Sequence, residues 1–158
     1  MKGRGVILWV DADACPRDAK EIVFRASQRL QLPVKLVACQ VIHAPSSELI
    51  ERIGVPGSPD AADDRIVELV SAGDLVVTDD VPLAARVVEK GAVALTPRGQ
   101  VFDADSAPQR LAARNLMEDL REREVIRGGG PAPYGPAYRR RFADALDRLL
   151  AKRTRGRR

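Results

Sequence analysis

Short apolar runs that stop at an acidic or turn-forming residue constrain the fold of this chain most strongly. The run at residues 6–10 reads Val-Ile-Leu-Trp-Val and ends at Asp11. An uninterrupted apolar run of this kind is typical of a strand buried on both faces, as in parallel sheets. Pro16 suits the first turn of a helix, and apolar residues then recur at helical spacing until Pro33. A second apolar run at residues 34–38 completes a β-α-β unit.

The same alternation continues along the rest of the chain. The elements predicted after residue 38 are helices at 46–53, 60–72, 82–90, 106–123 and 138–150, and strands at 75–78 and 92–95. The glycine- and proline-rich segment 128–136 is expected to be a flexible loop. The alternation predicts an α/β protein with a mostly parallel central sheet between two layers of helices. We expect one domain over residues 1–150, including a C-terminal helix, and a flexible basic tail over 151–158.

Composition limits the chemistry that is available to the chain. With 158 residues, 45% of them hydrophobic, the chain has the size and apolar content of one domain. No run resembles a secretory signal or could span a bilayer, so we expect a cytoplasmic protein without membrane contact. The two cysteines are expected to be reduced, and the single histidine, His43, excludes a histidine-rich metal centre. Segment 139–158 carries nine basic and two acidic residues, a patch that could hold phosphates.

Acidic residues cluster where the predicted strands end or helices begin. They are Asp11 and Asp13 after the first strand, Asp60, Asp63 and Asp64 at the start of a helix, and Asp79 and Asp80 after the third strand. Sites in parallel sheets form beyond the carboxyl ends of strands, so these carboxylates should converge and repel one another unless a cation binds. Oxygen ligands without histidine or thiolate favour Mg²⁺ or Mn²⁺. Asp60 and Asp80 have an alternative role as helix caps.

Metal-assisted phosphodiester hydrolysis is the reaction that this pattern favours. Bound divalent ions polarise a phosphodiester and activate water, so the chain needs no side-chain nucleophile. Arg98 and Arg17 are candidates for binding the substrate phosphate.

Three segments of the sequence resemble the YaiI/YqxD family of bacterial proteins. They are Asp11-Ala-Asp-Ala-Cys-Pro16, Gly73-Asp-Leu-Val-Val-Thr-Asp-Asp-Val-Pro-Leu-Ala84 and Pro97-Arg-Gly99. The fold of that family is related to the PIN-like nucleases, which cleave RNA with a metal-binding acidic cluster. The resemblance implies RNA as substrate and a PIN-like fold. It also implies metal ligation by Asp11, Asp60, Asp63 and Asp80, with the Thr78 hydroxyl orienting the site. From its place beside Asp11 after the first strand, Asp13 is expected to contribute to catalysis as a metal ligand or by positioning water.

Two other functions stay open on the sequence. Haloacid-dehalogenase-like phosphatases also place Asp-x-Asp after the first strand, and Asp11 would then be the nucleophile. Cys15 stands where such enzymes usually have Thr or Val, and no lysine shortly precedes Asp79, which weighs against this class. The other possibility is a non-catalytic regulatory protein that binds metal and RNA.

Overall fold

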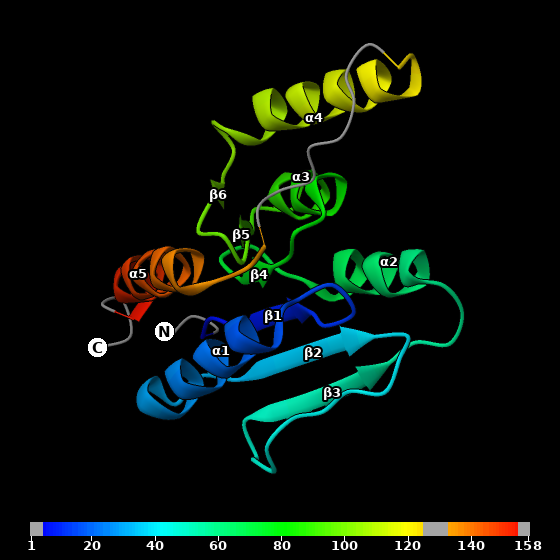
Figure 1. The fold of residues 1–158 in the computed structure, drawn as a ribbon. Coiled ribbons are helices and arrows are strands. Elements are labelled where there is room, and N and C mark those ends of the chain that lie inside the picture. Colours follow the sequence, from blue (N-terminus) through cyan, green and yellow to red (C-terminus); the bar gives the residue numbers. More distant parts are fainter. Residues whose placement is uncertain (1–4, 125–132, 155–158) are drawn as a thin grey trace.

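A computed structural model of the chain describes residues 5–124 and 133–154 (Figure 1). The strands are β1 (Leu8–Asp11), β2 (Val34–Ala38), β3 (Ile50–Gly54), β4 (Leu75–Val77), β5 (Val93–Leu95) and β6 (Val101–Phe102). The helices are α1 (Arg17–Leu30), α2 (Pro59–Leu69), α3 (Val81–Glu89), α4 (Ala107–Glu122) and α5 (Pro136–Thr154). The predicted α/β class with a mostly parallel sheet is therefore confirmed.

The strands form one sheet in the order β3-β2-β1-β4-β5-β6, in which β6 alone is antiparallel to its neighbour. The chain moves from β1 outward to β2 and β3, and then returns to place β4 on the other side of β1. Crevices form beyond the carboxyl ends of the strands at such a reversal. The register pairs Val10 with Val77 and Asp11 with Val37, so the residues that follow β1, β2 and β4 share this edge.

Helices cover both faces of the sheet because side chains of successive strand residues alternate between them. Leu8 and Val10 join one apolar cluster with residues of α1 and α5. Trp9 and Val76 join a second cluster with residues of α2 and α3. The side chain of Trp9 is 1% exposed, although its indole carries an N–H group that needs a partner. Two packed cores thus hold the central strands in place.

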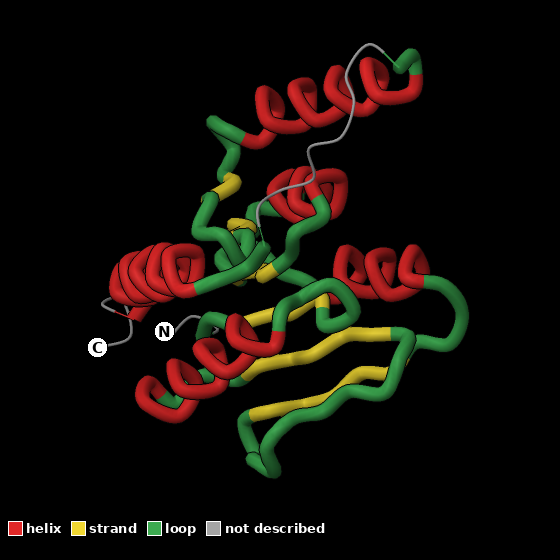
Figure 2. Tube along the Cα trace, viewed as in Figure 1, coloured by secondary structure: helices red, strands yellow, loops and turns green. Residues whose placement is uncertain are grey.

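The helix predicted at residues 46–53 is wrong. Residues 50–54 form β3, an edge strand that pairs with β2 from Val34↔Ile50 to Ala38↔Gly54 (Figure 2). Ile50 and Ile53 are three positions apart, a spacing that a helix would also bury on one face. Pairing with β2 prevails over this local pattern, and charged side chains at Glu51 and Arg52 suit an exposed edge.

The C-terminal helix extends further than its pattern predicted. Helix α5 packs against α1 and β5, with Phe142, Leu146 and Leu150 fully buried. It continues to Thr154, four residues beyond the predicted end, while residues 155–158 of the basic tail lie outside the described part of the chain. Most of the predicted loop at 128–136 also lies outside it. None of the helices described is long and apolar enough to cross a membrane.

Candidate functional site

A chain of hydrogen bonds joins the carboxyl ends of β1 and β4. The backbone N–H of Asp80 donates to Thr78 Oγ1 at 3.0 Å, and the Thr78 hydroxyl donates to Asp11 Oδ2 at 2.9 Å. Because the Thr78 oxygen accepts from the backbone, its proton is directed at the Asp11 carboxylate. Asp80 also accepts the Leu83 N–H through Oδ1 at 3.0 Å, so its carboxylate caps α3. The structure therefore brings three predicted site residues together at the reversal of the sheet.

The Asp11 carboxyl group is 4% exposed, which makes its ionisation costly. Burial raises its pKa from 3.8 to about 6, the Thr78 hydrogen bond lowers it, and the charges of Asp80, Asp13 and Asp79 raise it. The same neighbours that were predicted to converge thus act on Asp11 through their charges. Asp11 is the most deeply buried acidic residue of the predicted site.

Asp63 comes to this site from the first turns of α2. Its pKa is raised to about 7, first by burial and then by the charges of Asp11, Asp80 and Asp60, while Arg86 lowers it. Asp60 itself is exposed, and Ser58, the residue that precedes α2, makes no capping hydrogen bond through its side chain. The neighbouring Asp64 pairs with Arg86 at 2.9 Å.

The carboxylate of Asp13 is directed at the backbone of the segment that follows β2. Its Oδ2 accepts the N–H of Cys39 at 2.9 Å, and its Oδ1 accepts the N–H of Gln40 at 3.3 Å. Both oxygens therefore hold the chain that leaves β2 against the loop that leaves β1. Sequence reasoning placed Asp13 beside Asp11 and did not identify these amide partners.

Arg98 lies at the same edge of the sheet and pairs with an acidic residue that follows β4. Its Nη1 is 3.0 Å from Asp79 Oδ2, and its guanidinium lies 5.1 Å from the ring centre of Tyr138 on α5. The hydroxyl of Tyr134 donates to the Pro97 carbonyl oxygen at 2.9 Å. The start of α5 thus supports the turn that carries Arg98. No sequence signal had connected Tyr134 and Tyr138 to this turn, because they follow it by more than thirty residues.

Gly99 permits the close approach of this turn to α5. It has φ +91°, and a Cβ built there would lie 2.9 Å from the backbone carbonyl carbon of Arg141. Gly73 has nearly the same conformation, φ +88°, and open space around it. We expect Gly99→Ala to lower the free energy of unfolding by about 2–3 kcal/mol and Gly73→Ala by about 1 kcal/mol. Both variants strain the backbone at a positive φ, but only the methyl group added at position 99 would also overlap with the backbone of Arg141. Denaturant unfolding of both variants measures the difference, and equal losses would contradict a steric role.

Arg17, the other predicted phosphate-binding residue, begins α1. Its side chain is 90% exposed and lies 3.6 Å from Glu21, a pair that solvent screens. Cys15, just before α1, is free and buried, and burial raises the pKa of its thiol to about 12. Such a thiol stays protonated at neutral pH and is a poor nucleophile.

The predicted ligand set of Asp11, Asp60, Asp63 and Asp80 is only partly gathered. Within residues 5–124 and 133–154, no three His, Cys, Asp or Glu side chains are grouped closely enough to hold a metal ion. The donors still fit Mg²⁺ or Mn²⁺ in kind, since they are all carboxylate oxygens and repel one another. Mg²⁺ is usually held by one or two carboxylates, water and substrate phosphate, so a closed cage is not required.

Strand order and site together define a class of protein. It is an α/β protein with carboxylates at the point where the strand order of a mostly parallel sheet reverses. The chain belongs to the YaiI/YqxD family, because residues 9–152 match the family described as "Uncharacterized BCR, YaiI/YqxD family". The resemblance found in the sequence motifs is thereby confirmed for the family.

Curated relatives match nearly the whole chain. The UPF0178 protein of Trichlorobacter lovleyi is 51% identical over 145 residues, which cover 92% of this chain and 94% of the relative. The UPF0178 protein of Geobacter sulfurreducens is 52% identical over 143 residues, covering 90% and 95%. That of Bordetella petrii is 53% identical over 143 residues, with the same coverage. No solved structure matches the chain.

Proposed function

We propose that this chain is a cytoplasmic nuclease that hydrolyses phosphodiester bonds of RNA with the help of Mg²⁺ or Mn²⁺. The observation that carries the proposal is the hydrogen-bond chain from the Asp80 amide through Thr78 to Asp11 at the reversal of the sheet. It ties the Asp11 carboxylate, at the end of β1, to the backbone of Asp80 beyond the end of β4. The PIN-like nucleases, to which the sequence motifs are related by resemblance, use a site of this kind.

Asp11 and Asp80 are the residues that would hold the metal. One oxygen of Asp11 accepts a hydrogen bond from the Thr78 hydroxyl, and one oxygen of Asp80 accepts one from the Leu83 N–H. The second oxygen of each carboxylate accepts no hydrogen bond from the described residues. Asp63, with Asp60 beside it, is the next carboxylate that could bind the ion. When bound, Mg²⁺ or Mn²⁺ supplies Lewis acidity to the phosphodiester and lowers the pKa of a coordinated water. Arg98 at this edge offers a guanidinium to the substrate phosphate.

The position of Asp13 disfavours the phosphatase alternative. In a haloacid-dehalogenase-like mechanism, Asp11 would attack phosphorus and Asp13 would act as acid and base. Both Asp13 oxygens instead accept backbone N–H groups, of Cys39 and Gln40. Because both oxygens are engaged by these amides, the Asp13 carboxylate is directed at the segment that follows β2. Asp13 more readily supports the shape of the site.

Chelator-sensitive RNA cleavage is the expected result with purified protein. The protein is incubated with labelled single-stranded RNA and, separately, with a phosphomonoester, each with Mn²⁺ and with an excess of chelator. Cleavage of RNA should need Mn²⁺, stop in chelator and return when Mn²⁺ is restored, because Asp11 and Asp80 would otherwise face the phosphate as bare anions.

Each remaining outcome of this experiment excludes the proposal in a different way. Turnover of the phosphomonoester with a trapped aspartyl-phosphate would support the phosphatase. RNA binding without cleavage in any metal would support the non-catalytic regulatory protein. Mass spectrometry of the protein after reaction distinguishes the first case, and binding in chelator distinguishes the second.

A further inference from the structure

Away from the candidate site, a pocket of about 630 Å³ lies between α1 and the loop that follows β2. The residues that line this α1 pocket include Arg17, Lys20, Glu21, Phe24, His43 and Pro45. Pockets that hold small ligands have volumes of about 300–1,000 Å³, so its size is suitable. Its α1 residues are spaced at i, i+3, i+4 and i+7 and therefore share one face of the helix. That spacing is a sequence signal that could have revealed them as a group.

Both walls of the α1 pocket begin at the candidate site. Helix α1 starts directly after the loop that carries Asp11 and Asp13. The other wall follows Gln40, whose N–H is held by Asp13. The charges of Lys20 and of Asp11 both act on the Cys15 thiol, in opposite directions, which places the pocket and the site within electrostatic reach of each other. A polymer that occupied one could extend into the other.

The chemistry of the α1 pocket suits a nucleotide. The side-chain ammonium group of Lys20 makes no hydrogen bond or ion pair with any other residue that the structure describes. The acidic residue of the lining, Glu21, is shared between Arg17 at 3.6 Å and Arg25 at 3.9 Å. Phe24 is partly buried against the core and supplies an aromatic ring to the lining. Cations with an unopposed charge bind phosphate, and aromatic rings stack on bases.

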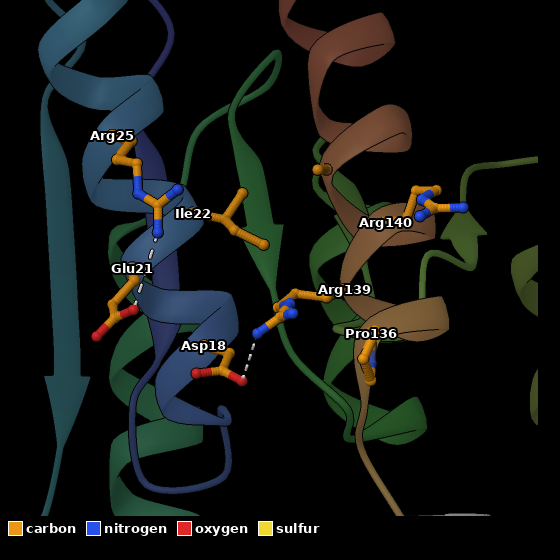
Figure 3. Close-up of a pocket in the computed structure, with 8 residues that line it drawn as sticks. Asp18, Glu21, Ile22, Arg25, Pro136, Arg139 and Arg140 are labelled. Carbon is orange, nitrogen blue, oxygen red and sulfur yellow. Dashed lines mark hydrogen bonds and ion pairs between the residues drawn. The ribbon is translucent and has the colours of Figure 1, made fainter.

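A groove on the neighbouring side of α1 differs from the α1 pocket in how its charges are paired. It lies between α1 and α5, and Figure 3 shows Asp18 directed at Arg139 and Glu21 at Arg25. The Asp18 and Arg139 side chains are 3.2 Å apart, so acid and base neutralise each other there. Arg140 extends away from α1 in this view. In this groove, therefore, an ion pair joins the two helices.

We propose that the α1 pocket binds one nucleotide of a single-stranded RNA, with Lys20 and Arg17 at the phosphates and Phe24 against the base. The inference rests on the proposed function in one respect, namely that RNA is the ligand that reaches the Asp11 site. A single aromatic residue provides one stacking platform, which suits one base. The α1 pocket would thus position the strand next to the bond that is cleaved.

Binding is measured in chelator, so that its result does not depend on cleavage. A short labelled single-stranded RNA is titrated against the full chain over a range of salt concentrations. Lys20→Gln should reduce the slope of log affinity against log salt by about 0.7, because one phosphate contact is lost. Phe24→Leu should weaken binding by about 5-fold or more and leave the slope unchanged, because a stacking contact carries no charge. Melting temperatures of both variants verify folding.

Arg114→Gln is the control, since Arg114 is an exposed cation on α4, outside the α1 pocket, that pairs with Glu118. It should change neither affinity nor slope. Wild-type affinity in both the Lys20 and the Phe24 variants would overturn the proposal. A nucleoside monophosphate is the third arm of the test. Weaker binding than RNA, with competition for the same site, supports an RNA subsite, whereas binding as tight as that of RNA would assign the α1 pocket to free nucleotides instead.

The two proposals can fail separately. If the wild-type protein cleaves RNA and both pocket variants bind it normally, the nuclease stands and the α1 pocket is rejected. If no metal supports cleavage and the variants still lose binding as described, the pocket stands and the nuclease is rejected. With both proposals correct, Lys20→Gln raises KM for RNA in Mn²⁺ and changes kcat little.

Discussion

Asp11→Asn is expected to lower metal-dependent RNA cleavage by at least about 100-fold, and the same variant is expected to be more stable than the wild type in chelator at about pH 8. The activity falls because the amide removes the charge that attracts the cation. The stability rises because the amide also removes the cost of ionising a buried carboxyl group. A residue retained only for packing would not produce these opposite effects.

The direction of the stability change follows from the pKa of Asp11. Its pKa is about 6 in the folded chain and 3.8 as the reference value for the unfolded chain. Because the folded value is higher, the wild type is relatively stable below about pH 4 and loses stability as the pH rises through about 6. A shift of this size amounts to roughly 2–3 kcal/mol in the metal-free protein. Asn does not titrate, so the advantage of the variant should vanish near about pH 4.

Thermal unfolding in chelator at both pH values, and then with Mn²⁺, measures this prediction. Mn²⁺ should stabilise the wild type by binding the folded state and should stabilise the Asp11 variant much less. Asp119→Asn is the control, because Asp119 pairs with Arg123 on the surface of α4 and lies in no predicted site. A variant that is less stable than the wild type at both pH values would show that Asp11 serves the fold alone.

The alternation of apolar runs and helical segments was sufficient to predict the class of fold and the edge where the site lies. Parallel strands place their carboxyl ends together, so the strand pattern predicted that Asp11 and Asp80 converge. The part of Thr78 in this site was implied by the resemblance to the YaiI/YqxD family and not by the pattern. Residues 50–53 were wrongly assigned to a helix, since an isoleucine spacing of three suits both a helix and the strand that pairs with β2. The two-residue strand β6 is too short to leave a pattern.

The hydrogen-bond and ion-pair partners of individual carboxylates could not be predicted from the sequence. Asp13 binds amides that arrive from β2, and Asp79 pairs with Arg98, nineteen positions later. Such contacts depend on where loops lie after the strands have paired, and no local period encodes them. Asp74 makes the same point. It precedes a strand, has no period to mark it, and is nevertheless 1% exposed.

Asp74→Ala is expected to lower the free energy of unfolding by about 3–5 kcal/mol, because it leaves one buried and two partly buried donors without this acceptor. The Asp74 carboxylate accepts the Trp9 indole N–H at 3.0 Å, the Ser71 N–H at 3.0 Å and the Ile7 N–H at 3.2 Å. These bonds join the starts of β1 and β4 at the end of the sheet opposite to the candidate site. The melting temperature should fall by about 10–15 °C.

A double-mutant cycle with Trp9→Phe tests whether the indole bond contributes to this loss. Phe keeps an aromatic ring in the core and removes the donor, so Trp9→Phe should cost less in the Asp74→Ala background than in the wild type. Chemical denaturation followed by circular dichroism suits all four proteins, since Trp9 is the only tryptophan and cannot serve as a probe throughout. If the two losses simply add, the indole bond carries no coupling energy, and the stability due to Asp74 would come from its other contacts, among them the backbone N–H groups of Ile7 and Ser71.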